Sequence, residues 1–319
     1  MKKIGVLTSG GDAPGMNAAI RAVVRYAVYN KLEVMGIFRG YAGLINEELK
    51  EFNHRSVSNI INRGGTILKT ARCPEFETEE GQSRAVQTIK KYAIDALVVI
   101  GGNGTHHGSL TLQRKWKIPV VGIASTIDND LNGSDYTLGY DTALNTALEA
   151  IDKIRDTATS MERIFVVEVM GRDTGLIALH VGLASGAEQI LIPEEKIDFQ
   201  AVCHEIVDGN IRGKISWIIV VAEGAGSAKE VAKKIEEITD LDVRAIVLGH
   251  IQRGGSPTAR DRILAARLST AAIDLILKNE FGKVVGIKGE ELNIVDIEYA
   301  IQKKKVDLDS LYNLVRILT

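Results

Sequence analysis

The sequence predicts an α/β protein made of two similar, Rossmann-like three-layer domains with mostly parallel sheets. Short apolar runs alternate with longer amphipathic segments along the chain, and this alternation is typical of parallel strands joined by right-handed crossover helices. The strand runs show little polar alternation, as expected for strands that helices cover on both faces. With 319 residues and 45% hydrophobic content, the chain can build a full core in each of two lobes.

The expected strands and helices follow from apolar runs and helical periodicity. The runs predicted to be strands are Lys3–Thr8, Glu33–Phe38, Ala96–Ile100, Pro119–Ala124, Ile164–Val169, Gln189–Ile192, Trp217–Ala222, Ala245–Leu248 and Val284–Ile287. Helical patterns lie between most of them, the clearest at Met16–Tyr29, Thr142–Asp156, Phe199–Asp208, Lys229–Ile238 and Thr258–Leu277. Because no proline- or serine-rich linker divides the chain, we expect short crossings between the lobes.

Charge and composition exclude several classes of protein. The 39 basic and 41 acidic side chains nearly cancel, so binding to nucleic acid or to a membrane surface has no bulk electrostatic support. The apolar runs have the length of strands, far below the ~20 residues of a membrane helix, and no signal peptide is visible. Cys73 and Cys203 lack metal-ligand spacing and fit a reducing compartment. We therefore expect a cytoplasmic protein without nucleic-acid or membrane partners.

The segment Thr126–Asp130 follows the predicted strand Pro119–Ala124 and carries the most informative chemistry. In an open α/β sheet, ligands bind at the carboxyl ends of the strands. Asp128 is a candidate general base for a substrate hydroxyl, and Thr126 is a hydroxyl donor beside it. Asp130 could orient a partner or approach a metal. The same composition is also typical of an Asx turn that caps the backbone, so this segment by itself leaves both interpretations open.

Five other predicted strand ends carry glycine together with polar or charged residues. Residues 8–15 form a glycine-rich turn before a helix, which suits a phosphate but also an ordinary tight turn. Residues 101–108 miss the dinucleotide fingerprint, because Gly108 stands too far from Gly104, and the chain contains no Walker-type phosphate loop. We interpret His106 and His107 there as solvent-facing loop residues, not metal ligands. The remaining three ends are residues 168–172, 222–224 and 249–257. Together with the earlier ones, they indicate phosphoryl transfer onto a sugar phosphate.

Arg163 and Arg172 stand at opposite ends of the predicted strand Ile164–Val169. One strand cannot easily bring both side chains to one site. Arg163 is therefore either a surface residue or part of a site on another subunit.

The chain resembles the bacterial ATP-dependent 6-phosphofructokinases over its whole length. The segments that carry the resemblance are Leu-Thr-Ser-Gly-Gly-Asp at 7–12, Ala-Arg-Cys-Pro-Glu-Phe at 71–76, Thr-Ile-Asp-Asn-Asp at 126–130, Asp-Lys-Ile-Arg-Asp-Thr-Ala at 152–158, Met-Gly-Arg at 170–172 and Gln-Arg-Gly-Gly-Ser-Pro at 252–257. The resemblance implies ATP-dependent phosphorylation of D-fructose 6-phosphate at its 1-hydroxyl, with Mg²⁺ as cofactor. The products would be fructose 1,6-bisphosphate and ADP, the committed step of glycolysis.

The resemblance also implies two discontinuous domains and their sites. Residues 1–138 with 252–305 would form a larger ATP-binding domain, and residues 139–251 with 306–319 a smaller sugar-phosphate-binding domain. Asp128 would accept the proton of the fructose 1-hydroxyl, while Thr126 and Arg172 would stabilise the transferred phosphoryl group. ATP would be held by Gly11, Arg72, Cys73, Gly102, Asn103, Gly104 and Thr105, with Tyr41 near the adenine. The sugar phosphate would contact Thr126, Ile127, Asp128, Met170, Gly171, Arg172, Glu223, His250, Ile251, Gln252 and Arg253.

A homotetramer is implied as well, in which Arg163 and Arg244 reach the 6-phosphate from a neighbouring subunit. An effector site for ADP or phosphoenolpyruvate would use Arg21, Arg25, Arg155, Gly186, Glu188, Arg212 and Lys214. Arg21 and Arg25 lie at i and i+4 of a predicted helix and, without the resemblance, would be interpreted as a solvated face.

The chain departs from the family pattern at positions that bear on activity. Asn103 replaces the aspartate that contacts nucleotide-bound Mg²⁺, and an amide should hold this hard cation less well than a carboxylate does. Ser125 adds a side chain where phosphate usually approaches bare backbone, and Met161 replaces histidine. At the implied effector site, Asn59 and Ile215 replace acidic and basic residues, so we expect blunted allosteric control.

Three other functions compete with the kinase. A catalytically weakened subunit that binds sugar phosphate and nucleotide is supported by Asn103 and opposed by the retained Asp128, Arg172 and Arg253. A pyrophosphate-dependent enzyme is disfavoured, because those relatives carry aspartate and lysine at Gly104 and Ser125. A nicotinamide dehydrogenase would need the missing dinucleotide fingerprint.

Overall fold

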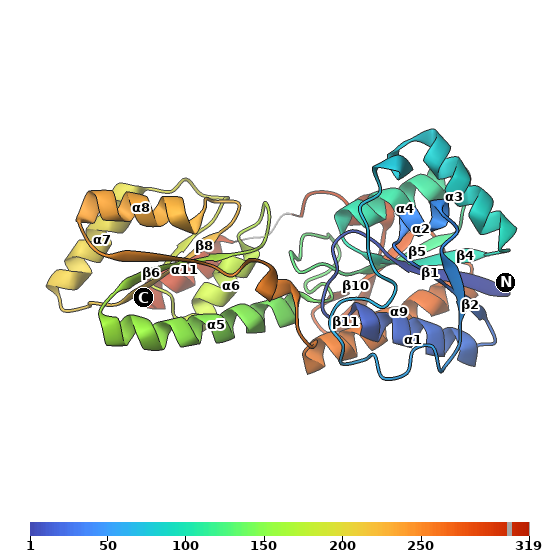
Figure 1. The fold of residues 1–319 in the computed structure, drawn as a ribbon, viewed down its shortest axis with the longest axis horizontal. Helices are drawn as coiled ribbons and strands as arrows, with labels where there is room; N and C mark the ends of the chain where they lie inside the picture. Colours follow the sequence, from blue (N-terminus) through green and yellow to red (C-terminus); the bar gives the residue numbers. More distant parts are fainter. Residues whose placement is uncertain (305–307, 319) are drawn as a thin grey trace. The chain divides into compact units, whose positions relative to one another are not determined.

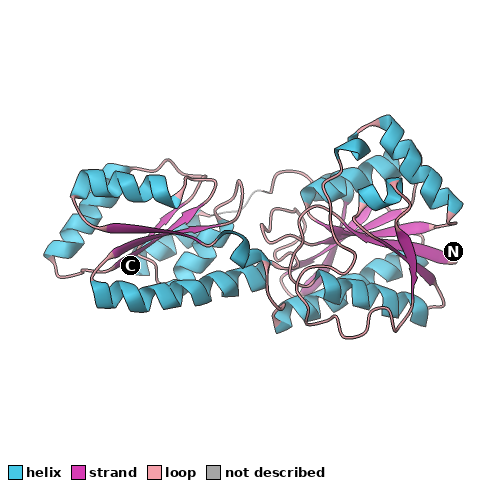
Figure 2. Ribbon diagram, viewed as in Figure 1, coloured by secondary structure: helices cyan, strands magenta, loops and turns pink. Residues whose placement is uncertain are grey.

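The computed structural model describes residues 1–304 and 308–318, and within them the chain divides into two compact units. Unit 1 comprises Met1–Thr142 and Arg253–Lys305, and unit 2 comprises Ala143–Gln252 and Val306–Thr319. The units meet at 142/143 and 252/253, whereas the predicted domains meet at 138/139 and 251/252. Each unit is an α/β structure with helices on both faces of a mostly parallel sheet, as predicted (Figures 1 and 2).

Among the described residues, unit 1 contains a seven-stranded sheet in the order β11-β10-β5-β4-β1-β2-β3. The strands β1, β2, β4, β5 and β10 are parallel to one another, whereas β3 and β11 pair antiparallel at the two edges. The strand bounds are Lys3–Thr8 for β1, Glu33–Ile37 for β2, Leu49–Phe52 for β3, Ala96–Gly101 for β4, Val120–Ala124 for β5, Lys283–Lys288 for β10 and Glu291–Asp296 for β11.

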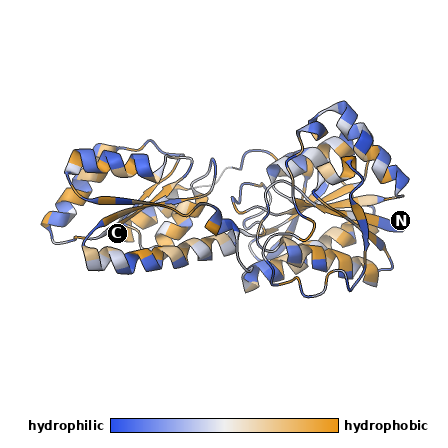
Figure 3. Cartoon of the chain, viewed as in Figure 1, coloured by the Kyte–Doolittle hydropathy of each residue, from blue (hydrophilic) through white to orange (hydrophobic). Residues whose placement is uncertain are grey.

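Helices cover both faces of this sheet. The helices α1 (Met16–Tyr29) and α9 (Ala259–Leu277) pack together on one face (Figure 1). The other face carries α2 (Tyr41–Ile45), α3 (Glu79–Lys91) and α4 (Asn103–Trp116), and α10 (Ile297–Ala300) packs against α4. A core cluster that includes Leu7, Ile37, Leu97 and Val99 fills the space under these helices. Figure 3 shows the apolar residues gathered on the strands and on the helix faces turned toward them.

Unit 2 contains a four-stranded, fully parallel sheet in the order β7-β8-β6-β9, as far as the structure describes it. Its strands are β6 (Ile164–Val169), β7 (Gln189–Leu191), β8 (Trp217–Ala222) and β9 (Val243–Val247). The helices α7 (Phe199–Ile211) and α8 (Ala228–Thr239) lie on one face, and α5 (Tyr140–Met161) and α6 (Leu176–Ser185) lie on the other (Figure 1). The helix α11 (Asp309–Leu318) packs against α6.

The strands and α-helices that were not among the named predictions are β3, β11, α2, α3, α4, α6, α10 and α11. The edge strands β3 and β11 are largely exposed, so they lack the apolar runs that marked the buried strands. The prediction of a loop over residues 101–108 was wrong, because α4 begins at Asn103. Its buried positions Thr105, His106, Ser109 and Leu112 follow helical spacing, but three of them are polar or titratable and gave no hydrophobic signal.

The prediction that His106 faces solvent was also wrong, although His107 is exposed. The His106 side chain is fully buried against β5, where a Cβ on Gly122 would lie 2.5 Å from the imidazole. Neither ring nitrogen makes a hydrogen bond of ordinary geometry within the described residues, although the backbone near Gly101 and Ile123 lies close by. Burial is the main cause that lowers the pKa of His106 to about 4, so the ring stays neutral in the folded protein.

We predict that His106 makes the fold sensitive to acid. In the unfolded chain the imidazole regains its ordinary, higher pKa. The contribution of the neutral ring to the free energy of unfolding is therefore fully present above the unfolded-state pKa and is lost as pH falls toward about 4. Between about pH 7.5 and about pH 5, wild type should lose about 2 kcal/mol more free energy of unfolding than His106→Phe does. Urea unfolding at both pH values measures this difference, with exposed His107→Gln as the control. Equal acid sensitivity of His106→Phe and wild type would contradict the prediction.

Candidate active site

The carboxyl ends of β1, β4 and β5 lie next to one another at one edge of the unit 1 sheet. The three strands are adjacent and parallel, with Thr8 paired to Ile100 and Gly101 paired to Ala124. The chain proceeds from β1 to β2 on one side, whereas β4 lies on the other side of β1. Such a reversal of strand order opens a crevice at the carboxyl ends, which is where open α/β sheets bind ligands.

The glycine turns and the start of α4 line this edge together. The Thr105 hydroxyl donates to the Ser9 carbonyl at 2.9 Å, and the Ser125 amide donates to the Gly101 carbonyl at 3.0 Å. A Cβ on Gly102 would lie 3.2 Å from the Thr126 Cβ, so the Gly102 backbone lies close to Thr126, one of the candidate catalytic residues. The N-cap of α4, Gly102, provides no side-chain cap. The first N–H groups of this helix therefore remain suited to a phosphate.

The loop after β5 is organised by Asn129. This residue has a left-handed backbone with φ 52°. Its side-chain amide donates to the Asp135 carbonyl at 2.7 Å, and its side-chain oxygen accepts from the Thr137 amide at 3.0 Å. The Thr137 hydroxyl in turn donates to the Thr126 carbonyl. These bonds reach six and eight residues along the chain, whereas an Asx turn bonds the backbone two residues on, so they are not the Asx turn considered above. They nevertheless hold the segment that carries the buried Asp128.

Arg253 lies against the first glycine turn. Its guanidinium donates to the Asp12 carbonyl at 2.8 Å and is 3.6 Å from the Asp12 carboxylate. A Cβ on Gly11 would lie 2.0 Å from the same guanidinium nitrogen, so this approach requires glycine. The predicted nucleotide residue Gly11 and the predicted sugar-phosphate residue Arg253 thus meet within unit 1.

Tyr41 supports the first turn of α4 from inside unit 1. Its hydroxyl donates to the Thr105 carbonyl at 2.6 Å, and its ring stacks on Phe76 with centroids 4.2 Å apart. Burial raises the pKa of this phenol, so it remains protonated and can donate. Phe76 belongs to the 3-10 turn Pro74–Glu77 that follows the predicted nucleotide residues, of which Arg72 is exposed and Cys73 half-buried.

In unit 2, predicted sugar-phosphate residues meet at the carboxyl ends of β6 and β8. The Glu223 carboxylate accepts hydrogen bonds from the Gly171 amide at 3.2 Å and the Arg172 amide at 2.8 Å. The buried Gln252 side chain accepts from the Met170 amide at 2.8 Å. Both Gly171 and Arg172 have positive φ, at 142° and 52°. Of the other predicted residues, His250 and Ile251 are exposed beside Gln252.

Arg163 and Arg244 meet at the opposite edge of the same sheet. Both are bound to Asp242, with Arg163 Nε at 3.0 Å and Arg244 Nη2 at 3.1 Å from one carboxylate oxygen. They stand at the amino ends of the paired parallel strands β6 and β9. Since Met170 and Glu223 lie at the carboxyl ends, the two groups are separated by the length of the strands.

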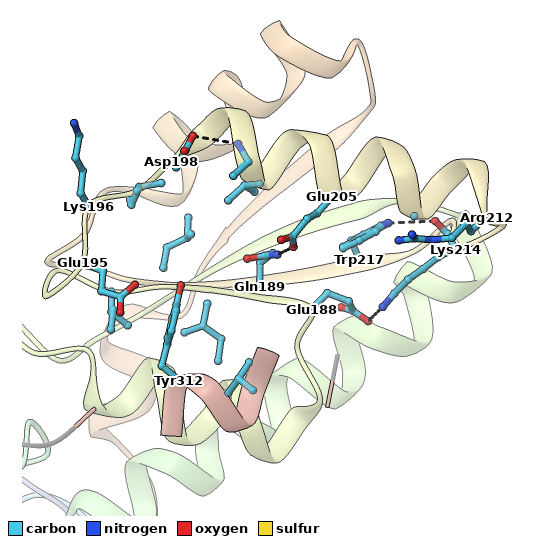
Figure 4. Close-up of a pocket in the computed structure, with 18 residues that line it drawn as sticks. Glu188, Gln189, Glu195, Lys196, Asp198, Glu205, Arg212, Lys214, Trp217 and Tyr312 are labelled. Carbon is cyan, nitrogen blue, oxygen red and sulfur yellow. Dashed lines mark hydrogen bonds and ion pairs between the residues drawn. The ribbon is translucent and has the colours of Figure 1, made fainter. Parts of the chain in front are cut away.

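The effector residues predicted in unit 2 also gather. The Glu188 carboxylate is 3.2 Å from Arg155 and 3.5 Å from Lys214, and Arg155 donates to the Gly186 carbonyl at 2.7 Å. Glu188 and Lys214, together with Arg212, line a cavity of about 620 Å³ beside β7 (Figure 4). The remaining two, Arg21 and Arg25, lie on α1 of unit 1, where burial and then the charge of Arg25 lower the pKa of Arg21.

Within residues 1–304 and 308–318, no group of three or more His, Cys, Asp or Glu side chains could hold a metal ion. The Asn103 side-chain oxygen is buried without a hydrogen-bond partner among these residues. A neutral oxygen in that state fits one ligand of a cation whose other ligands are phosphate and water, as is usual for Mg²⁺. No described helix is long and apolar enough to span a bilayer.

The two mostly parallel sheets with glycine-lined strand ends define an α/β protein of the class that binds its ligands at the carboxyl ends of strands. The chain belongs to the phosphofructokinase family, whose model matches residues 3–276. It is 54% identical to the ATP-dependent 6-phosphofructokinase of Clostridium botulinum (strain Eklund 17B / Type B), and the match covers 100% of both chains. The family predicted from the sequence is thereby confirmed.

Solved structures agree with this assignment. Phosphofructokinase of Pichia pastoris in the T-state superimposes with a TM-score of 0.89 and 35% identity, covering 94% of this chain and 37% of that chain. The pyrophosphate-dependent phosphofructokinase of Marinobacter aquaeolei has a TM-score of 0.85 with 22% identity, covering 100% and 91%. The second likeness establishes the fold alone.

We predict that Asn129 is a main determinant of loop stability. Asn129→Ala should lower the free energy of unfolding by about 2–4 kcal/mol, because it removes the side-chain hydrogen bonds and strains the left-handed backbone. Asn129→Gly keeps the backbone freedom and should lose about 1 kcal/mol less. Urea unfolding of wild type and the two variants measures the contributions of the side-chain hydrogen bonds and of the backbone strain. An alanine variant as stable as wild type would refute the role given to Asn129.

Proposed function

We propose that this chain transfers the γ-phosphoryl group of ATP to the 1-hydroxyl of fructose 6-phosphate, giving fructose 1,6-bisphosphate and ADP. The observation that carries the proposal is the adjacent ends of β1, β4 and β5, which bring the glycine turns, the start of α4 and the Thr126–Asp130 segment to one edge. The full-length relatives that bear the name ATP-dependent 6-phosphofructokinase support the same reaction.

We assign the proton transfer to Asp128. As a carboxylate it accepts the proton of the fructose 1-hydroxyl while the oxygen attacks the γ-phosphorus and the bond to the ADP oxygen breaks. Thr126, two residues after β5 and beside Gly102, donates from its hydroxyl to the phosphoryl oxygens. Arg172 neutralises negative charge on the same group. Most of the rate acceleration comes from positioning and charge stabilisation, as is general for phosphoryl transfer.

The nucleotide would lie along the unit 1 edge. Gly11 and Gly102–Thr105 offer backbone N–H groups to its phosphates, and Gly104 leaves open space, since a Cβ there would meet no atom within 4 Å. Arg72 and Cys73 would contact the nucleoside side. Asn103 would be the protein ligand toward Mg²⁺, which would supply positive charge against the nucleotide phosphates.

The sugar phosphate would contact Thr126, Ile127 and Asp128 together with the unit 2 residues Met170, Gly171, Arg172, Glu223, His250, Ile251 and Gln252, and with Arg253. Arg163 and Arg244 stand at the other edge of the unit 2 sheet, so they cannot serve the same copy of that edge. We propose that they reach the 6-phosphate of a neighbouring subunit in a homotetramer. Asp242 would keep both arginine side chains in place before the phosphate binds.

A regulatory site is proposed at Arg155, Gly186, Glu188, Arg212 and Lys214, with Arg21 and Arg25. Its ligand would be ADP or phosphoenolpyruvate, anions that Arg and Lys bind through phosphate oxygens. Exposed Asn59 and Ile215 give this site fewer charged groups, which would blunt control. The fructose 6-phosphate saturation curve with and without phosphoenolpyruvate tests this, and a steep, strongly shifted curve counts against it.

We expect purified protein to release ADP only when fructose 6-phosphate, ATP and Mg²⁺ are all present. Asp128→Asn should lower kcat by about a hundredfold to ten-thousandfold while ATP still binds, because only the proton acceptor is lost. ADP release by a coupled assay and ATP binding by calorimetry measure the two effects. Tight binding of both substrates by wild type without ADP release would instead favour a ligand-binding subunit, the function that Asn103 supports.

We predict that Asn103→Asp lowers the Mg²⁺ concentration needed for half-maximal activity. The substitution restores a carboxylate oxygen at a buried, unpartnered position, and Mg²⁺ prefers such a ligand. A Mg²⁺ titration of kcat at saturating substrates measures the change, with Asn313→Asp, at an exposed position of α11, as the control. Identical Mg²⁺ titrations for wild type and Asn103→Asp would contradict the prediction.

A further inference from the structure

Lys304, in the segment that follows α10, reaches back to the loop after β5. Its ammonium donates to the Asn129 carbonyl at 3.0 Å and to the Ser134 carbonyl at 2.6 Å. Lysine side chains usually extend into solvent, whereas this one is only partly exposed and ends on main-chain oxygens. The two carbonyls flank Asp130, so one ammonium group connects both sides of the loop.

The same segment is tied to the loop at a second residue. The Asn132 amide donates to the Ala300 carbonyl at 3.0 Å, and the Asn132 side chain donates to the Gln302 carbonyl at 2.6 Å. Residues 300–304 therefore lie alongside the loop, with Ala300 and Gln302 at Asn132 and Lys304 at Asn129. The hydrogen bonds from Asn132 are neutral, and Lys304 adds the positive charge.

The charge is placed at the peptide group that follows Asn129. The Asn129 carbonyl that Lys304 binds belongs to the peptide between Asn129 and Asp130, and Asn129 holds the left-handed conformation of the loop. A rotation of that peptide would change the direction of the chain on either side, including the Asp128 position. A hydrogen bond from an ammonium group resists such a rotation more strongly than a neutral one does.

Burial and the neighbouring carboxylates shift the pKa of Lys304 in opposite directions. Burial lowers the pKa of the ammonium to about 8, whereas the carboxylates of Asp135 and Asp130 favour its charged form. At neutral pH the ammonium therefore stays protonated and keeps the hydrogen atoms that both carbonyls need.

We propose that Lys304 is a positioning residue for phosphoryl transfer, which fixes the loop from Asn129 to Ser134 and thereby the place of the Asp128 carboxylate. The proposal rests on the role given to Asp128 above. Lys304 reaches only main-chain oxygens among its described hydrogen bonds, so it acts through the loop and not on a substrate. Its loss should therefore lower kcat more than it changes the affinity for either substrate.

The test compares Lys304→Met with wild type, Lys304→Arg and Lys303→Met. The methionine variant keeps a chain of similar length but removes the charge and the donors. It should lower kcat by about tenfold to a hundredfold, because small misplacements of a reacting group have effects of that size. The KM values for ATP and fructose 6-phosphate should stay within about threefold of wild type, since the contacts proposed for substrate remain. Lys304→Arg keeps charge and donors and should retain more of kcat than Lys304→Met.

Lys303 is exposed next to Lys304 and serves as the matched control, with kcat expected unchanged for Lys303→Met. Thermal melting identifies variants that do not fold, and Lys304→Gln, which can still donate to one carbonyl, replaces Lys304→Met if that variant is unfolded. A folded Lys304→Met with the kcat of an active wild type overturns the inference and leaves the proposed function intact. Failure of both variants to fold makes Lys304 a structural residue and also overturns it. An inactive wild type overturns the proposed function first, and the inference with it.

Discussion

The loop that follows β5 depends on one residue, Asn129, and the catalytic proposal depends on that loop. A left-handed backbone at a residue with a short amide side chain turns the chain sharply, and the amide then binds Asp135 and Thr137 across the turn. Asp128 is adjacent and mostly buried, so its position follows from the hydrogen bonds of its neighbour. The same short segment has a structural and a chemical role: the Asn129 amide stabilises the turn, and the turn positions the Asp128 carboxylate.

Parallel strand pairing sets the second constraint. In unit 1 it gathers the ends of β1, β4 and β5 at one edge, where backbone N–H groups and a helix N-terminus offer a place for phosphate. In unit 2 it separates two groups of polar residues. Met170, Gly171 and Glu223 lie at one edge, while Arg163 and Arg244 bind Asp242 at the other. A chain that needs all of these residues for one substrate needs more than one copy of itself, which is the physical reason for proposing a tetramer.

The strands were predictable because parallel strands buried on both faces must be apolar over their whole length. The bounds of β1, β6 and β8 agree with the predicted runs to the residue. The edge strands β3 and β11 escaped prediction because one side of each faces solvent and dilutes the pattern. The start of α4 escaped for another reason: Asn103, Gly104 and Thr105 are poor helix formers, and tertiary contacts from Ser9 and Tyr41 hold them in the helix.

The sequence by itself determined the fold class, the family and the glycine- and charge-bearing strand ends, because these depend on local patterns and motifs that survive without coordinates. Only the tertiary structure decided what each side chain contacts. It buried His106, brought Arg253 onto Gly11, and joined Lys304 to Asn129 across most of the chain. Such contacts link residues far apart in sequence, and one sequence contains no signal for them. Their geometry exists only once the strands have paired and the helices have packed.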